Sequence, residues 1–293
     1  MKIVELYMSS EQPVLSLEIF PPNVVYPLET VFDTLNELIK LKAKYISVTY
    51  PGGDNRIRTV EIAARIKKQF GIETQAHLTC IGHTAEEVDK LLEELTKESI
   101  TNIMALRGDF PPGPVFNIDK QSFRYANELV RFIKNKGDFG VAAAAHPEGH
   151  PECSRLKEDL LHLKQKVEAG VDFLITQLFF DNRIYYDFID KALSIGIACP
   201  VIPGIMPVLN PPQIKKMIYL NGGSLPAALI KIIDKYENQS ESMEKAGIEY
   251  AVRQIEDLVK NGVAGIHMYT MNKATQISYI VESAGLGQNS EFE

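Results

Sequence analysis

The sequence predicts an α/β protein that folds as a single (β/α)8 barrel of the TIM type, and three observations lead to this prediction. Short apolar runs alternate with longer amphipathic ones along the chain, and eight of the short runs have the length of strands. These runs are rich in Val, Ile and Ala and mostly lack polar alternation, as is typical of parallel strands buried on both faces. The length of 293 residues fits one barrel. An open, doubly wound sheet is the alternative that the same pattern allows.

The expected strands are spaced along the whole chain and cover 14–20, 45–50, 74–80, 101–106, 140–145, 173–179, 200–206 and 264–270. Helical patterns lie between them, among others at 28–44, 85–99 and 122–137. The longest departure from strict alternation is 207–262, where we expect two or three helices. No linker or low-complexity segment interrupts the chain. We therefore expect one catalytic domain over 1–293, with a disordered tail over about 287–293.

Composition and charge exclude several classes of partner. The net charge of -7 argues against binding to nucleic acid or to an anionic membrane surface. No apolar run is long enough to span a membrane, and the first residues lack the apolar core of a signal peptide, which together favour a cytoplasmic protein. Cys80, Cys153 and Cys199 are too scattered for a disulfide framework or a zinc site, so no metal is expected.

Polar side chains gather where the expected strands end. In a (β/α)8 barrel the chemistry takes place at the C-terminal ends of the strands. The polar residues at or just after these ends are Glu18, Thr49, His77, Arg107, Asp109, His146, His150, Gln177 and Tyr269. A barrel that only had to fold would need fewer of them, so we expect an active site at this end.

Glu18 lies in "SLEIFPP", with apolar residues and two prolines after it. An apolar setting disfavours the charged form of a carboxylate, which makes Glu18 a candidate general acid. The alternative is a buried glutamate paired with Arg or Lys.

The segment "ALRGDFPP" runs from an apolar strand directly into two opposite charges. Gly108 allows a flat or phosphorylated ligand to approach the backbone closely. Arg107 has the fork geometry that binds phosphate, and Asp109 adds a fixed negative charge beside it. Pro111 and Pro112 are expected to stiffen the exit.

A polar stripe lies on the expected helix around residues 156–168. Asp159, His162 and Lys166 recur at spacings of three and four, beside an apolar stripe that faces the core. They form either a solvated face or one wall of a cofactor groove. The sequence lacks both GxGxxG after a strand and GxxxxGK[ST], so side chains and strand-end loops must hold any nucleotide cofactor.

Eight motifs occur in order along nearly the whole chain: "SLEIFPP", "SVTYPGG", "QAHLTC", "NIMALRGDFP", "AAHPEGHPE", "LITQLFFD", "PVIPGIMP" and "GIHMYTMN". Together they resemble the pattern of the bacterial methylenetetrahydrofolate reductases. The resemblance implies a barrel that binds FAD and reduces 5,10-methylenetetrahydrofolate to 5-methyltetrahydrofolate, within one-carbon metabolism and methionine biosynthesis.

The resemblance also implies roles for individual residues. The flavin would be lined by Thr49, His77, Leu106, Arg107, Gly108 and Asp109, and its ribityl, phosphates and adenosine end would be held by Ala144, His150, Asp159 and Lys166. Glu18 would protonate folate N10, and Asp109 would face both flavin and folate. Gln177 and Tyr269 would contact folate or nicotinamide.

The chain departs from the family pattern at four positions. His146 stands where the family usually has a flavin-contacting tyrosine, and His162 and Gln165 stand where it often has Asn and Arg. Pro211 replaces an aromatic residue. The electron donor therefore stays open between NAD(P)H and a partner subunit, and an oligomer is expected. A flavin-free reductase with direct hydride transfer from a nicotinamide, and a noncatalytic folate-binding subunit of a methyl-transfer complex, are the alternatives.

Overall fold

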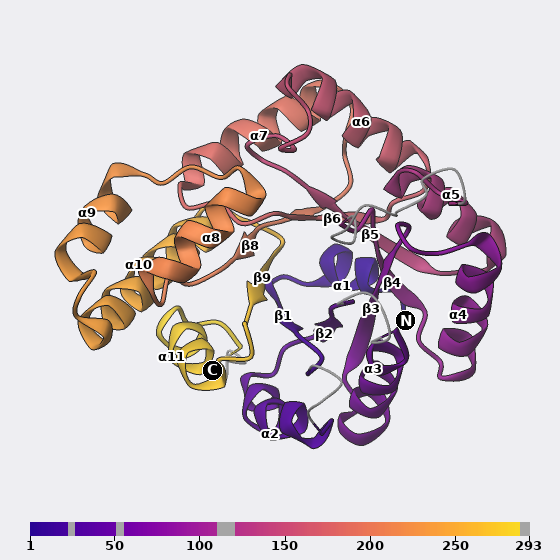
Figure 1. Ribbon diagram of the computed structural model, residues 1–293, viewed down its shortest axis with the longest axis horizontal. Helices are drawn as coiled ribbons and strands as arrows, with labels where there is room; N and C mark the ends of the chain where they lie inside the picture. The colour runs from indigo at the N-terminus through magenta and orange to yellow at the C-terminus, as the bar shows by residue number, and fades with distance from the viewer. Residues whose placement is uncertain (23–26, 51–55, 110–120, 288–293) are drawn as a thin grey trace, which may run out of the picture.

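A ring of parallel strands surrounded by helices forms the molecule (Figure 1). The computed structural model describes residues 1–22, 27–50, 56–109 and 121–287. Within these ranges the strands are β1 (Val14–Ile19), β2 (Tyr45–Val48), β3 (Glu73–Thr79), β4 (Asn102–Leu106), β5 (Gly140–Ala145), β6 (Phe173–Thr176), β7 (Val201–Ile202), β8 (Gly204–Ile205) and β9 (Gly265–Tyr269). The (β/α)8 barrel predicted from the sequence is confirmed. Pro111, Pro112 and the tail beyond Gly287 lie outside the described residues.

The ring closes at Pro203. The strand order is β7-β6-β5-β4-β3-β2-β1-β9-β8, so the two edges of the sheet belong to neighbouring segments of the chain. The single strand expected over 200–206 is thus two short strands, because a proline has no N–H to donate to the ladder. The carbonyl of Pro203 still accepts a hydrogen bond from the His267 N–H at 3.0 Å. The doubly wound alternative is wrong.

The helices of the described residues cover the outside of the ring, with two exceptions discussed below. They are α1 (Ile3–Ser9), α2 (Glu29–Leu38), the 3-10 turn η1 (Ile39–Leu41), α3 (Arg56–Phe70), α4 (Ala85–Lys97), α5 (Ala126–Lys136), α6 (Leu156–Glu168), α7 (Asn182–Ser194), α8 (Pro211–Asn221), α9 (Ala227–Tyr236), α10 (Ser240–Lys260) and α11 (Ala274–Ser283). None of these helices is long and apolar enough to cross a membrane.

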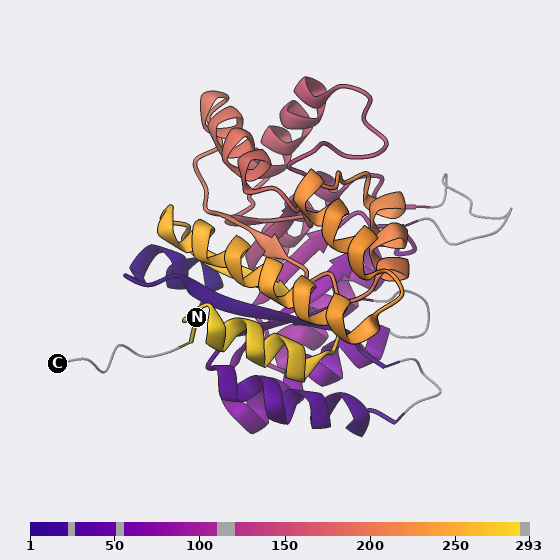
Figure 2. The same ribbon diagram turned by 90° about the vertical axis from the view of Figure 1, so that its left-hand side faces the viewer.

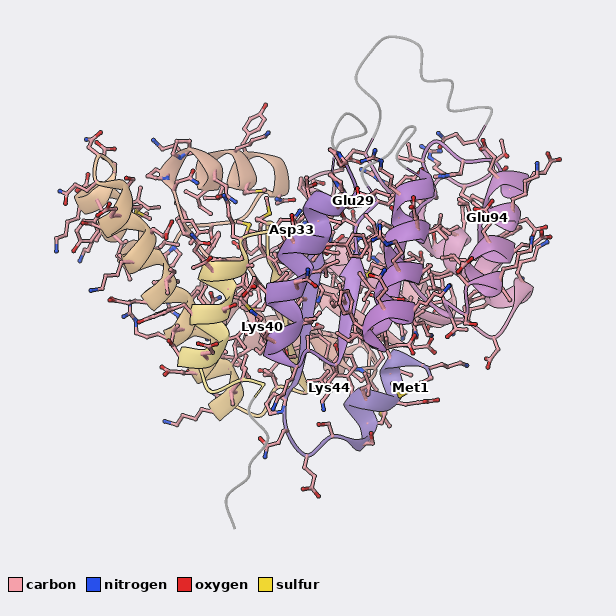
Figure 3. The ribbon with its side chains drawn as sticks, turned by 90° about the horizontal axis from the view of Figure 1, so that it is seen from below. Met1, Glu29, Asp33, Lys40, Lys44 and Glu94 are labelled. Carbon is pink, nitrogen blue, oxygen red and sulfur yellow. The ribbon has the colours of Figure 1, made fainter. Side chains whose placement is uncertain are left out.

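Helix α2 shows why these segments are helical. Its buried residues recur with the helical period, as expected for one apolar face against a sheet: Val31, Phe32, Leu35 and Leu38. Glu29 and Asp33 are exposed on the opposite face, as is Lys40 just after the helix, and Figure 3 shows all three at the surface.

Helix α1 is the first exception, because it lies across one end of the barrel (Figures 1 and 2). The sequence did not predict it. Ile3 and Tyr7 are buried in a cluster inside the lower barrel, which we call the floor cluster: Ile3, Tyr7, Val14, Tyr45, Met104, Ala142, Phe173, Ile175 and Ile202. The Tyr7 and Tyr45 hydroxyls are 2.8 Å apart, and the Ile3 N–H donates to Asn102 Oδ1 at 2.8 Å. The floor is closed, so a site must open at the other end.

The segment 207–262 is the second exception and contains three helices, as expected. Helices α8, α9 and α10 enclose an apolar cluster distinct from the main core: Leu178, Phe180, Met206, Val208, Ile214, Leu229, Ile233 and Met243. Helix α10 packs closely against the backbone of Val208 at Gly247, where an added Cβ would lie 1.8 Å from the Val208 carbonyl oxygen. This contact holds the three-helix segment against the end of β8.

Candidate active site

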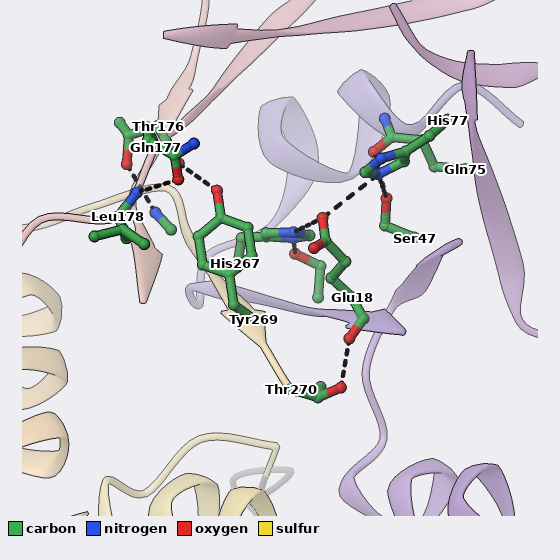
Figure 4. Close-up of polar contacts among 12 residues, drawn as sticks. Glu18, Ser47, Gln75, His77, Thr176, Gln177, Leu178, His267, Tyr269 and Thr270 are labelled. Carbon is green, nitrogen blue, oxygen red and sulfur yellow. Dashed lines mark hydrogen bonds and ion pairs between the residues drawn. The ribbon is translucent and has the colours of Figure 1, made fainter. Parts of the chain in front are cut away.

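Glu18 lies at the end of β1, between β2 and β9. Its register partners are Ser47 on β2 and Tyr269 on β9. Because successive strand residues alternate between the two faces, Ser16 and Glu18 share the inner face of the barrel, as do His267 and Tyr269. The inner face of adjacent strands thus collects the polar groups drawn in Figure 4.

The Glu18 carboxylate is held by two histidines. Its Oε2 lies 3.5 Å from Nε2 of His77 and 3.5 Å from Nε2 of His267. All three residues are buried, with exposed fractions of 7% or less. The sequence predicted an apolar setting, with pairing to Arg or Lys as the alternative. The carboxylate lies beside two imidazoles in the structure instead. An imidazole differs from Arg and Lys because it can give up its proton near neutral pH.

His77 is neutral around pH 7. Burial lowers the pKa of its imidazole to about 4, although the charge of Glu18 acts in the opposite direction. Nε2 of the ring lies 2.8 Å from the Ser47 hydroxyl, which donates to Gln75 Oε1 at 3.1 Å. With Ser47 donating to Gln75, His77 donates its Nε2–H to Ser47. The same N–H is the one that faces Glu18.

His267 completes the group on the other side. Its Nδ1 lies 2.9 Å from the Ser16 hydroxyl, and its Nε2 faces Glu18. Sequence reasoning missed Ser16, Ser47 and His267 as site residues. Their two-residue spacing from Glu18, Thr49 and Tyr269 was the pattern that could have found them.

Tyr269 lies between Glu18 and the end of β6, where Thr176 and Gln177 lie, as Figure 4 shows. The Tyr269 hydroxyl donates to the Thr176 carbonyl at 2.6 Å. Burial, together with the charge of Glu18, raises the pKa of Tyr269 well above its usual value, so the hydroxyl stays a donor. Gln177 donates from Nε2 to Asn221 Oδ1 at 3.0 Å. Glu18, Gln177 and Tyr269, predicted from distant motifs, therefore share one site.

A second group of predicted residues lines a pocket of about 390 Å³ between β5, α5 and α6, which we call the β5–α6 pocket. Its lining includes Arg107, Ala144, His146, His150, Asp159, His162 and Lys166. This volume lies within the range of small-molecule sites. Thr49, His77, Leu106, Gly108 and Asp109 lie instead at or just after the ends of β2, β3 and β4.

The pocket combines the cations Lys166 and Arg107 with the imidazoles of His146 and His150. Lys166 donates to the Ala144 carbonyl at 2.6 Å, and burial lowers its pKa to about 8. Burial, with Lys166 and His150 nearby, lowers the pKa of His146 to about 3. The rings of His146 and His150 meet edge to face at 4.8 Å. The polar stripe of α6 therefore lines the pocket, because Asp159, His162 and Lys166 all belong to its wall.

The guanidinium group of Arg107 is already paired with a carboxylate. Its two terminal nitrogens donate to the carboxylate of Glu152 at 2.5 and 2.7 Å. Carboxylate and phosphate accept the same bidentate geometry, so Glu152 takes the place that the sequence predicted for a phosphate. Gly108 adopts φ +84°, and a Cβ there would lie 2.9 Å from Cβ of Thr79. Asp109 is exposed.

Three buried polar atoms near these groups have no partner among the described residues. They are Oγ1 of Thr49, Nε2 of Gln75 and Oδ1 of Asn127. A buried polar atom is usually hydrogen-bonded, so such atoms indicate where a ligand can bind. Asn127 lines the β5–α6 pocket and was not predicted from the sequence.

A family model described as "Methylenetetrahydrofolate reductase" matches residues 3–285. The chain belongs to the methylenetetrahydrofolate reductase family. The 5,10-methylenetetrahydrofolate reductase of Escherichia coli (strain K12) is 37% identical over 268 residues, which cover 91% of this chain and 88% of that protein. Methylenetetrahydrofolate reductase (NADH) 1 of Arabidopsis thaliana is 32% identical over 308 residues, covering 100% of this chain and 52% of the plant protein. This reductase-family chain is therefore an oxidoreductase.

Solved structures share the fold of this reductase-family chain. A Clostridium thermocellum protein that binds two copies of 5-methyl-5,6,7,8-tetrahydrofolic acid superposes with a TM-score of 0.61 at 14% identity, covering 96% of both chains. A dihydropteroate synthase of Coxiella burnetii, in complex with pteroic acid, gives a TM-score of 0.53 at 14% identity. At these identities the likeness concerns the barrel.

Proposed function

We propose that this chain reduces 5,10-methylenetetrahydrofolate to 5-methyltetrahydrofolate, in the cytoplasm, with FAD as cofactor and Glu18 as general acid. The observation that carries the proposal is the buried Glu18 carboxylate between two imidazoles, beside Tyr269 and Gln177. Membership of the reductase family and the names of the bacterial relatives support the substrate.

Glu18 protonates N10 of the folate, the nitrogen that leaves when the methylene bridge opens. The methylene bridge of the folate opens to an iminium cation before it accepts a hydride, and protonation of N10 makes that nitrogen a leaving group. A positioned acid of this kind contributes roughly 10²–10⁴-fold in rate. Glu18 would pass its proton to N10, and Nε2 of His267 lies 3.5 Å from Oε2 of Glu18. Neutral His77 orients the carboxylate without fixing it as an anion.

Asp109, Gln177 and Tyr269 act on the rest of the folate. A carboxylate near the iminium cation lowers the barrier by attraction, and Asp109 stands exposed at the end of β4 for that purpose. Gln177 and Tyr269 donate hydrogen bonds that now go to Asn221 and to the Thr176 carbonyl. Exchange of these internal partners for folate polar groups orients the substrate.

The residues of the β5–α6 pocket fit the polar half of FAD. Lys166 and the Arg107 fork suit the phosphates, with Glu152 displaced, and the unpartnered Asn127 Oδ1 and Thr49 Oγ1 suit polar groups of the cofactor. His146, His150 and His162, with Ala144 and Asp159, would line the ribityl and adenosine portions of FAD. His77, Leu106 and the Gly108 backbone would line its ring. Bound flavin supplies the hydride that the opened folate accepts.

The electrons come from NAD(P)H or through a partner subunit. NADH and NADPH appear in the names of the plant and Caenorhabditis elegans relatives. Pro211, which replaces an aromatic of the family pattern, occupies the first turn of α8 behind the N-cap Asn210, a position that suits proline. The departure at Pro211 therefore has a local structural reason.

An anaerobic titration tests the proposal. The purified chain, loaded with FAD, is mixed with NADH, NADPH or a chemical reductant, and then with 5,10-methylenetetrahydrofolate. We expect a yellow protein whose flavin is bleached by reductant and restored by the folate. A colourless protein that still turns over folate would establish the flavin-free alternative. Flavin binding without folate turnover under any donor would contradict the proposed activity.

A further inference from the structure

We propose that Cys153, Asp159 and His162 form a binding site for a divalent transition metal of the Zn²⁺ class on the wall of the β5–α6 pocket. Their ligand atoms, one from each side chain, all lie within 4.8 Å of one another. Ligand atoms around one tetrahedral Zn²⁺ lie roughly 3.5 Å apart. Binding of one ion therefore requires the three ligand atoms to approach by about 1 Å, and the His162 side chain is exposed.

The backbone of His150 positions two of the ligands, Cys153 and Asp159, by hydrogen bonds. The Cys153 N–H donates to the His150 carbonyl at 2.8 Å, and the His150 N–H donates to Asp159 Oδ2 at 3.2 Å. Asp159 and His162 are three residues apart on α6, so they project from the same face of the helix. The thiol, which precedes the helix, is thus brought to a carboxylate and an imidazole that are already adjacent.

The donor set selects the metal. A thiolate, an imidazole and a carboxylate suit Zn²⁺ and similar transition metals, whereas Mg²⁺ and Ca²⁺ prefer oxygen ligands alone. Three protein ligands leave a fourth position for water or another small ligand. Two cations face the same pocket: Glu152 neutralises Arg107, but Lys166 opposes a metal charge. We therefore expect weaker binding than at a structural zinc site.

The metal and the flavin exclude each other. This second part rests on the proposed function, because it assigns Asp159 and His162 to the flavin as well. A metal bound to both side chains withdraws them from the cofactor and places its own ligand in the pocket. The pocket then accepts either a transition metal or the flavin.

Cobalt provides a direct readout of the site. Co²⁺ is added to the full chain after removal of flavin, and a thiolate-to-cobalt charge-transfer absorption is expected at one ion per chain. Cys153→Ser should abolish this absorption, whereas Cys199→Ser, which lies apart from the pocket, should keep it. An absorption that persists in Cys153→Ser, or no binding of Co²⁺ to a folded wild-type chain, would overturn the site.

Competition is measured separately with Zn²⁺ and FAD. Saturating Zn²⁺ should weaken FAD binding to the wild type at least tenfold and leave FAD binding to Cys153→Ser unchanged. Zn²⁺ binding with unaltered FAD affinity would overturn the exclusion and leave the metal site intact. A chain that binds Co²⁺ through Cys153 but never binds FAD would instead contradict the proposed function.

Discussion

Glu18 is placed between two histidines rather than beside a permanent cation, and this choice of partner determines its chemistry. Arg or Lys would hold the carboxylate as an anion at all physiological pH values. Nε2 of His77 and Nε2 of His267 each lie 3.5 Å from the same carboxylate oxygen, and His77 is neutral around pH 7. The residue is therefore positioned without losing its ability to act as an acid.

The burial of His77 makes stability depend on pH. The pKa of its imidazole is about 4 in the folded chain and about 6.5 in the unfolded chain. The unfolded chain therefore takes up a proton first as the pH falls. Stability from neutral His77 is thus complete above about pH 6.5 and is lost progressively down to about pH 4. The loss amounts to about 3 kcal/mol at most. Urea unfolding across this range should show a shallower pH dependence for His77→Gln; an unchanged dependence would contradict this account.

Glu152 competes with any anion for Arg107. Glu152→Ala removes one partner of the fork, and an exposed ion pair of this kind is worth about 0.2–1 kcal/mol. FAD should therefore bind up to about fivefold more tightly to Glu152→Ala, as measured by fluorescence titration. Arg107→Ala serves as the opposite case and should weaken binding. Weaker binding in Glu152→Ala would show that Glu152 belongs to the cofactor site.

At the scale of elements, apolar periodicity predicted the strands and helices whose formation depends on local sequence. The buried strands and helices such as α4 and α5 lie where apolar periodicity placed them. Helix α1 was missed because a seven-residue segment has little helical preference of its own, and Ile3 and Tyr7 are ordered by the floor cluster. The division of β7 from β8 was missed because the effect of Pro203 depends on ring closure.

Gly247 tests the packing of α10. Ala favours a helix over Gly by about 1 kcal/mol, so Gly247→Ala would stabilise an isolated helix. In this fold the new Cβ meets the Val208 carbonyl, and α10 must move away from the end of β8. We expect a net loss of roughly 3 kcal/mol or more in chemical denaturation. Glu256→Ala, at an exposed position of the same helix, is the control and should change stability by less than about 0.5 kcal/mol. A neutral Gly247→Ala would contradict the close packing.

At the scale of the whole molecule, the barrel has a closed floor and an open, polar end. Strand-end reasoning predicted Glu18, Gln177 and Tyr269 as one site because barrel topology brings all strand ends together. It could not predict that Glu152 holds Arg107 or that Cys153 joins Asp159 and His162. These contacts depend on the path of the β5–α6 loop, which no periodicity encodes.

The floor itself is open to test. Ile3→Ala removes a fully buried side chain from the floor cluster and should cost about 2–5 kcal/mol. Met8→Ala, on the same helix but 76% exposed, should be nearly neutral. Thermal and urea unfolding of both variants give the comparison. Equal, small effects would mean that α1 does not seal the barrel.

Glu18→Gln, followed through the two half-reactions separately, tests the central claim most directly. The variant keeps the shape and most hydrogen bonds of Glu18 but has no acidic proton. Flavin binding and flavin reduction should stay near the wild-type level, while reoxidation by 5,10-methylenetetrahydrofolate should slow by roughly 10²–10⁴-fold. Asp109→Asn, in contrast, should disturb both half-reactions. Near-normal folate reduction by Glu18→Gln, or loss of flavin from it, would show that Glu18 is structural and contradict the account.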